Sequence, residues 1–147
     1  MKTAFLLGRL VFGGFFLYNG IHHFQQRKML SQYAAHKNVP VPDAAVLATG
    51  ALLVAGGTSV LLGVKPKMGT LAIMAFLAGV SPMIHDFWKS QDPGERQNEM
   101  INFMKNMGLL GGALALMGVE EPWPVSVPLG QPTTLERIQR FAREVAA

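Results

Sequence analysis

Residues 44 to 64 read AAVLATGALLVAGGTSVLLGV, and no charged side chain interrupts this run. A helix rises about 1.5 Å per residue, so roughly 20 apolar residues cross a bilayer core that is about 30 Å thick. The run therefore predicts a transmembrane helix.

Three further apolar stretches of similar length lie along the chain. They are Phe5 to Ile21, Met68 to Ile84 and Met100 to Val119. Only Lys65-Pro66-Lys67 separates the second and third of the four stretches, and so short a connection makes neighbouring helices antiparallel. We therefore expect an all-α membrane protein, built as an antiparallel four-helix transmembrane bundle.

The composition agrees with a membrane protein and excludes several other classes. Half of the residues are hydrophobic and only 15% are charged, whereas a soluble domain carries about a quarter charged residues. The chain has no cysteine, which excludes disulfides, thiolate nucleophiles and cysteine-ligated metal or iron–sulfur sites. The net charge of +4 comes without a basic run, so it suits anionic lipid headgroups and not nucleic acid. We expect the partners to be the bilayer and either other membrane subunits or further copies of this chain.

The segments outside the four stretches predict further elements. Phe24 to Ala35 mixes apolar residues with Gln, Arg and Lys, which predicts a short helix in the membrane interface. Asp43 is placed to cap the second span. After the fourth span, a proline-rich link holds Trp123, an expected interface anchor.

The last part of the chain predicts a separate unit. Thr133-Thr134-Leu135-Glu136 is a capping-box pattern, and the residues after it have the spacing of an amphipathic helix on the membrane surface or against a partner. We therefore divide the chain into a four-helix transmembrane domain, residues 1–120, and a proline-rich link with an amphipathic tail, residues 121–147.

Positively charged residues suggest an orientation. Four spans place both termini and the second loop on one side, which then carries seven Lys and Arg residues against six on the other. The totals are balanced, but Lys65-Pro66-Lys67 is the kind of short loop whose positive charge marks the cytoplasm. We expect a multi-pass protein of the bacterial inner membrane with both termini in the cytoplasm.

Polar residues gather at three helix ends that face the same side of the membrane. They are His22, His23, His85, Asp86, Asn102, Lys105 and Asn106. Histidine titrates near neutral pH, ligates metals and haem and can hydrogen-bond a quinone oxygen, and an adjacent acid can orient its ring. Three interpretations are open: a polar ring that satisfies helix ends, a site for a quinone or similar redox ligand, and a haem or metal site. The histidine spacing is not diagnostic of ligation, so we expect no metal.

Two cations inside the spans carry their own expectations. Arg9 either reaches the headgroups of the terminal side or anchors an anionic ligand or a partner's carboxylate. Lys105 shares one side of its helix with Asn102 and Asn106. We expect it to point into the bundle, toward Asp86, Glu99 or a ligand, because grouped polar residues seldom face lipid tails.

Glycine and proline predict how the helices pack and end. Pairs of glycines lie near the middle of three spans, and small residues let helices approach closely; a groove for a flat ligand is the alternative. These pairs are Gly13-Gly14, Gly56-Gly57 and Gly111-Gly112. Pro82 should bend or end the third span, since proline lacks an amide donor and crowds the carbonyl four residues back.

Several of these residues also form a family pattern. Arg9-Leu10 and Gly13-Gly14 lie in the first span, with Gly20 and His23-Phe24 at its end. The second half contributes His85-Asp86-Phe87-Trp88 and Asn102 to Asn106. In these features the chain resembles the DoxX family of small four-span membrane proteins, over about Lys2 to Val119. The family takes its name from a membrane subunit associated with a thiosulfate:quinone oxidoreductase. The resemblance implies a partner of an oxidoreductase system or an assembly factor, and it supplies no shared catalytic set.

Two functions follow as hypotheses. The first is a redox-associated membrane subunit that places a quinone near His22, His23, His85 and Lys105, with Asp86 as a proton relay. The second is a non-catalytic accessory or assembly subunit of a larger membrane complex. Neither establishes that the chain is itself an enzyme. No cofactor is required by the sequence, and a quinone is the one candidate.

Overall fold

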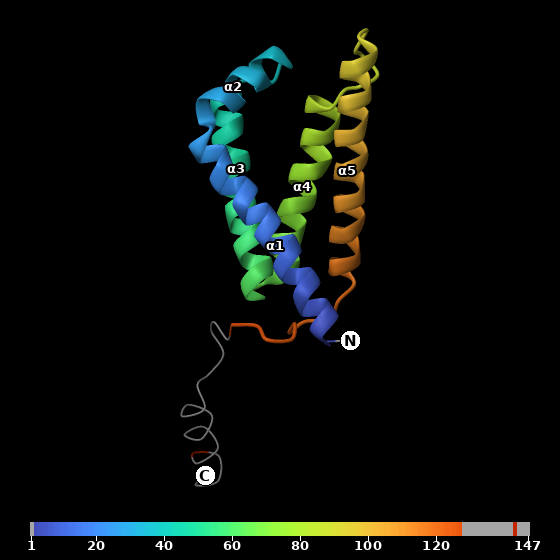
Figure 1. Cartoon of the computed structure of the whole chain (residues 1–147). Coiled ribbons are helices and arrows are strands. Elements are labelled where there is room, and N and C mark those ends of the chain that lie inside the picture. Colours follow the sequence, from blue (N-terminus) through green and yellow to red (C-terminus); the bar gives the residue numbers. More distant parts are fainter. Residues whose placement is uncertain (1, 128–142, 144–147) are drawn as a thin grey trace.

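The computed structural model describes residues 2–127 and residue 143 of the chain. Within this part the secondary structure is entirely helical (Figure 1). The helices are α1 (Lys2–Gln25), α2 (Arg27–His36), α3 (Pro42–Leu62), α4 (Pro66–Ile84) and α5 (Pro93–Met117). The tail helix expected from Thr133 onward lies outside the described residues.

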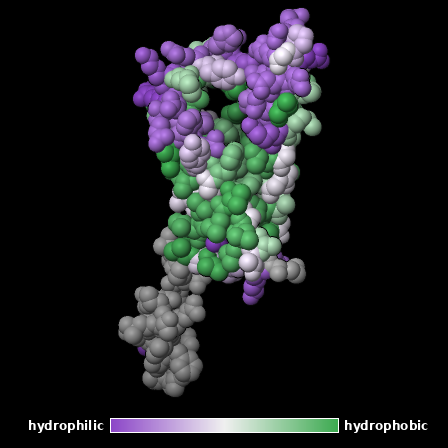
Figure 2. Space-filling model, in the orientation of Figure 1, coloured by the Kyte–Doolittle hydropathy of each residue, from purple (hydrophilic) through white to green (hydrophobic). Residues whose placement is uncertain are grey.

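Four of these helices, α1, α3, α4 and α5, are long and apolar enough to cross a membrane. They run alternately up and down, and α2 lies across the end where α1 finishes and α3 begins (Figure 1). Hydrophilic residues gather at this end, above a broad hydrophobic band (Figure 2). The four-helix bundle is therefore confirmed. The short helix predicted within Phe24 to Ala35 is present as α2, shifted by a few residues because α1 continues through Gln25.

Proline marks the beginning of three helices. Pro42, Pro66 and Pro93 each stand at the first turn of their helix, where a missing amide donor costs nothing. Asp92 caps α5 by accepting a hydrogen bond from the Glu95 amide at 2.7 Å. The helix α3 ends at Leu62, and the next residue, Gly63, caps it. Its φ of 67° is a left-handed value that suits glycine.

Asp43 does not cap α3, so that prediction is wrong. The residue before α3 is Val41, in a left-handed conformation, and no side chain caps the helix. Asp43 instead lies in the first helical turn and binds Arg27 and Ser31 of α2. The carboxylate is thus used to tie α2 to α3.

Close packing between helices relies on glycine, as expected for two of the three glycine pairs. A Cβ atom built on Gly57 would lie 2.5 Å from the backbone nitrogen of Leu17, so α1 and α3 touch through their backbones. In the first pair, a Cβ built on Gly13 would lie 3.0 Å from the Leu61 nitrogen of α3, and Gly56 makes a similar contact with Gly69 of α4. Gly111 differs, because nothing lies within 4 Å of a Cβ placed there. The α5 pair therefore does not make a comparable contact inside this bundle.

The helices pack in the order α1, α3, α4, α5. Their buried core consists of Phe16, Leu53, Val60, Ile73, Leu77 and Trp123. Trp123 is only 2% exposed and meets the edge of Phe5 with ring centroids 5.3 Å apart. The interface anchor expected there is instead a core residue, because the segment after α5 folds back under the bundle. The domain boundary at residue 120 stays a prediction, although residues 121–127 lie against the helices: the Val127 amide donates to the Leu62 carbonyl.

Pro82 lies near the end of α4, which stops two residues later at Ile84. The Ser81 hydroxyl donates to the Leu77 carbonyl at this point, and the His85 amide donates to Ser81. Since α4 continues through Pro82 to Ile84, the expected bend or end at Pro82 stays a prediction; the end of α4 at Ile84 delivers His85 and Asp86 to the polar end of the bundle.

Candidate functional site

The polar end of the bundle contains the helix ends that the sequence brought together. His22 and His23 lie in the last turns of α1, His85 and Asp86 directly follow α4, and α5 begins at Pro93 on the same side. The expectation that these ends share one membrane face is confirmed. The centre of this region, however, is Lys37, which was not predicted as a site residue.

Lys37, just after α2, forms that centre. Its ammonium lies 3.1 Å from Asp86 Oδ1 and 3.1 Å from Glu99 Oε1, so one cation joins the α2–α3 connection to both α4 and α5. The side chains of Lys37 and Glu99 are only 10% and 8% exposed. Breaking such a buried pair leaves an uncompensated charge, which is costly.

The Glu99 carboxylate accepts hydrogen bonds from two further side chains. The Tyr33 hydroxyl donates to Glu99 Oε1 at 2.9 Å, and His85 Nδ1 donates to Oε2 at 2.7 Å. Both carboxylate oxygens are therefore occupied. On the outer side, Lys89 contacts the second oxygen of Asp86 at 3.1 Å. We call Tyr33, Lys37, His85, Asp86 and Glu99 the polar cluster.

The electrostatics of the polar cluster favour its charged form. Burial disfavours a charged Lys37, but hydrogen bonds to Asp86 and Glu99 outweigh it and raise the pKa of Lys37. Burial likewise opposes the Asp86 carboxylate, yet hydrogen bonds from Lys37 and Lys89 lower the pKa of Asp86. Burial and the hydrogen bond to Glu99 raise the pKa of Tyr33 to about 12, so its hydroxyl remains a proton donor at neutral pH.

Aromatic rings stand beside the polar cluster. Phe87 and Trp88 follow His85 and Asp86 in the chain, and both meet Phe103 of α5 edge to face, at 5.6 and 5.9 Å between ring centroids. Phe103 lies one helical turn after Glu99. A histidine held by a carboxylate thus lies two residues before a group of three aromatic rings.

His85 keeps one ring nitrogen available. Nδ1 donates to Glu99, which fixes the tautomer of a neutral ring and leaves Nε2 as an acceptor. Nε2 has no hydrogen-bond partner within residues 2–127. The arrangement can therefore accept a proton from a ligand hydroxyl, or donate one after the ring is protonated.

The two α1 histidines lie apart from the polar cluster. His23 donates through Nδ1 to the Asn19 carbonyl at 2.7 Å, and its ring meets Phe76 of α4 at 5.9 Å. His22 stacks on Tyr18 one turn before it, at 6.0 Å. His23 thus faces the bundle, whereas His22 packs along its own helix.

The α5 residues divide in the same way. Lys105 is exposed, and its ammonium donates to Asn102 Oδ1 at 2.9 Å. The expectation that Lys105 points inward to Asp86 or Glu99 is wrong, because Lys37 already occupies the position between those carboxylates. Asn106 does face inward: it is 7% exposed and lies seven residues after Glu99, on the same side of α5.

Arg9 serves the opposite end of the bundle. It is 3% exposed, and its guanidinium donates to the carbonyls of Pro124 and Val125 at 2.8 and 3.0 Å. Its Nε is buried and has no hydrogen-bond partner among the residues that the structure describes. Arg9 therefore does not reach the headgroups. Its observed contacts are with the chain's own segment after α5, and a role as an anchor for an anion or a partner stays a prediction.

Tyr33, Lys37 and Glu99 were not predicted as site residues from the sequence. Tyr33 and Lys37 are four residues apart and therefore share one side of the last turn of α2. That spacing was a usable signal for one polar side of the connection. Nothing local indicated that this side would meet Glu99, which is 66 residues away from Tyr33 in the chain.

The sequence profile of the DoxX family matches residues 4–86, which is more than half of the chain. No curated protein and no solved structure matches the chain. The matched part covers α1 to α4 and ends at Asp86, so it contains most of the polar cluster and excludes Glu99. The chain belongs to the DoxX family.

Proposed function

We propose that this DoxX-family membrane protein is a subunit of a quinone-linked redox system and holds the quinone ring at His85. The observation that carries the proposal is that His85, which binds the Glu99 carboxylate, lies two residues before Phe87, whose ring packs with those of Trp88 and Phe103. Aromatic side chains favour a flat ring through stacking and edge contacts. A hydrogen-bonding nitrogen beside them gives such a ring an orientation.

His85 would bind an oxygen of the ring through Nε2. Glu99 keeps Nδ1 protonated and stabilises the ring when it becomes charged, as a carboxylate does for a histidine that exchanges protons. Lys37 and Tyr33 hold Glu99 in place from the other side. Asn106 offers a second polar group deeper on the same side of α5, since its amide has no partner in the part of the chain that the structure describes.

A bound quinone would supply two-electron, two-proton chemistry. The chain has no cysteine for a thiol or iron–sulfur centre, and we place the electron donor on a partner subunit. The chain's own residues handle the ring and its protons. This division agrees with a small subunit that works beside an oxidoreductase.

Quinone content tests the proposal. The protein would be purified from its native membranes in mild detergent and extracted with solvent, and the quinone released per chain would be measured. We expect His85→Ala to lower the content about tenfold, the loss expected for one hydrogen bond to a charged or buried partner. His36→Ala is the matched control, because His36 is an exposed histidine at the end of α2. Wild-type protein without quinone, and without binding on titration, would contradict the proposal.

A non-catalytic accessory or assembly subunit is the second candidate function. One side of α5 favours it, because Met104 and Leu114 are 62% and 55% exposed and Gly108 and Gly111 have open space around them. Exposed glycines on a transmembrane helix permit close approach of another helix. Native mass analysis after mild extraction separates the two candidates. Stable larger assemblies without quinone favour the accessory role, and a quinone-containing monomer argues against it.

A further inference from the structure

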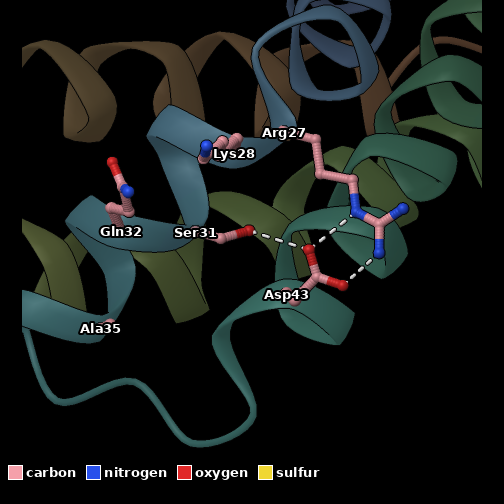
Figure 3. Close-up of a pocket in the computed structure, with 6 residues that line it drawn as sticks. All are labelled: Arg27, Lys28, Ser31, Gln32, Ala35 and Asp43. Carbon is pink, nitrogen blue, oxygen red and sulfur yellow. Dashed lines mark hydrogen bonds and ion pairs between the residues drawn. The ribbon is translucent and has the colours of Figure 1, made fainter.

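A pocket lined by several polar and charged residues lies where α2 meets the start of α3. It is a hollow of about 470 Å³. It is lined by Arg27, Lys28, Ser31, Gln32, Ala35 and Asp43 (Figure 3). Since α2 lies at the end of the membrane-spanning helices, the pocket lies at the level expected for lipid headgroups.

The pocket carries a surplus of positive charge and free donors. Asp43 accepts hydrogen bonds from Arg27 and from Ser31, so its charge is already neutralised within the pocket (Figure 3). Lys28 and Gln32 have no hydrogen bond or ion pair to any residue that the structure describes. One ammonium and one amide therefore remain available to an anion.

An apolar groove of about 590 Å³ lies on the membrane-facing side of α3. Phe24 of α1 forms one wall, and Ala51, Ala55, Thr58 and Leu62 of α3 belong to its floor. These α3 residues follow one another at spacings of three and four and so form one stripe along the helix. From Ala51 to Leu62 the stripe is about 16 Å long.

The pocket and the groove both border α3, one above the other along the helix. Asp43 precedes Ala51 by eight residues, which places it about 12 Å along the axis and about 80° around the helix from Ala51. Phe24 lies three residues before Arg27 and packs on Gly50, with its ring 3.3 Å from a Cβ built on that glycine. A cationic pocket at headgroup level thus lies above an apolar groove on the same helix, α3, with the Phe24 ring on Gly50 between them along the chain.

We infer that this surface binds one anionic phospholipid. The phosphate and headgroup contact Lys28, Gln32 and the outer side of Arg27, and an acyl chain lies along Ala51, Ala55, Thr58 and Leu62. Charge selects an anionic headgroup, because the pocket is positive and Asp43 is already paired. The groove favours a lipid over a free phosphate ion, because only the lipid has an acyl chain that can fill it. This inference is independent of the quinone proposal.

Native mass spectrometry in neutral detergent tests the lipid site. Phosphatidylglycerol and phosphatidylcholine with the same acyl chains would be titrated separately onto delipidated protein. We expect one phosphatidylglycerol per chain, retained in preference to phosphatidylcholine. Lys28→Gln should weaken phosphatidylglycerol binding about fivefold, the effect of one basic residue near a lipid surface, and should leave phosphatidylcholine unchanged. Lys2→Gln at the opposite end of the bundle is the charge-matched control.

A second variant tests the groove. Ala55→Phe fills the stripe and should reduce binding of both lipids, whereas Ala75→Phe, on an exposed side of α4, should reduce neither. Equal retention of the two lipids by wild-type protein would overturn the inference. So would an Ala55→Phe variant that binds normally, which would mean that only the phosphate is recognised or that the groove receives something else, such as a partner helix.

Discussion

Lys37 stabilises two carboxylates at once, so its loss should be severe. Lys37→Met removes the cation that Asp86 and Glu99 share and leaves them only Lys89 and His85 as partners, so the loss should reach at most about 3–5 kcal/mol, the cost of a fully unpaired buried charge. Lys105→Met is the matched control, because Lys105 is exposed and binds only Asn102; its effect should stay within about 0.5 kcal/mol. Unfolding of both variants in one detergent measures the difference. Similar stabilities would contradict the central position of Lys37.

Asp86 should make stability depend on acid pH. Its pKa is lowered in the folded protein from an ordinary value of 3.8 by Lys37 and Lys89, despite burial. A lowered pKa contributes stability above the ordinary value, and the contribution is lost as the pH falls through the folded value. Asp86→Asn should therefore destabilise the protein at pH 7 and lose less stability than wild type on acidification below about pH 4. Melting temperatures at pH 7 and pH 3 test this; parallel losses in both proteins would count against it.

The contrast between Lys37 and Lys105 shows how far single residues could be predicted. Helical spacing correctly grouped Lys105 with Asn102, and these two side chains do bind each other. Spacing could not reveal that Lys37, from the α2–α3 connection, would bind Asp86 and Glu99 in place of Lys105. Such a contact depends on where α2 lies relative to α5, which is a property of the tertiary structure.

At the scale of helices, glycine positions predict opposite outcomes for the same substitution. Gly57→Ala forces a methyl group against the α1 backbone, 2.5 Å from the Leu17 nitrogen, and overpacking of this kind costs about 1–3 kcal/mol. Gly111→Ala meets nothing within 4 Å, and alanine favours a helix over glycine by about 0.5–1 kcal/mol. Thermal unfolding in detergent should show a lower melting temperature for the first variant and an equal or higher one for the second. A destabilised Gly111→Ala monomer would show that the open side of α5 is not open.

The positions of the helices were the most predictable feature, and the contacts between distant segments of the chain were the least predictable. Hydrophobic length alone located α1, α3, α4 and α5, because a membrane requires long apolar helices whatever their neighbours. The role of Trp123 depended on a tight return of the chain after α5, held by the buried Arg9. Its proline-rich surroundings indicated an extended link, and they did not reveal that the link would pack under the bundle.

At the scale of the whole molecule, the alternating helices make a prediction about membrane sides. The chain has no native cysteine, so single cysteines can be introduced without interference. Gln91→Cys lies in the α4–α5 connection at the polar end, and Lys67→Cys lies by the α3–α4 turn at the opposite end. Short positively charged loops remain in the cytoplasm, so a membrane-impermeant thiol reagent added outside intact cells should label Gln91→Cys and spare Lys67→Cys. Permeabilised cells, in which both must react, are the control. The reverse labelling pattern would mean that the protein has the same fold in the opposite orientation. Labelling of both variants from outside would contradict four transmembrane helices.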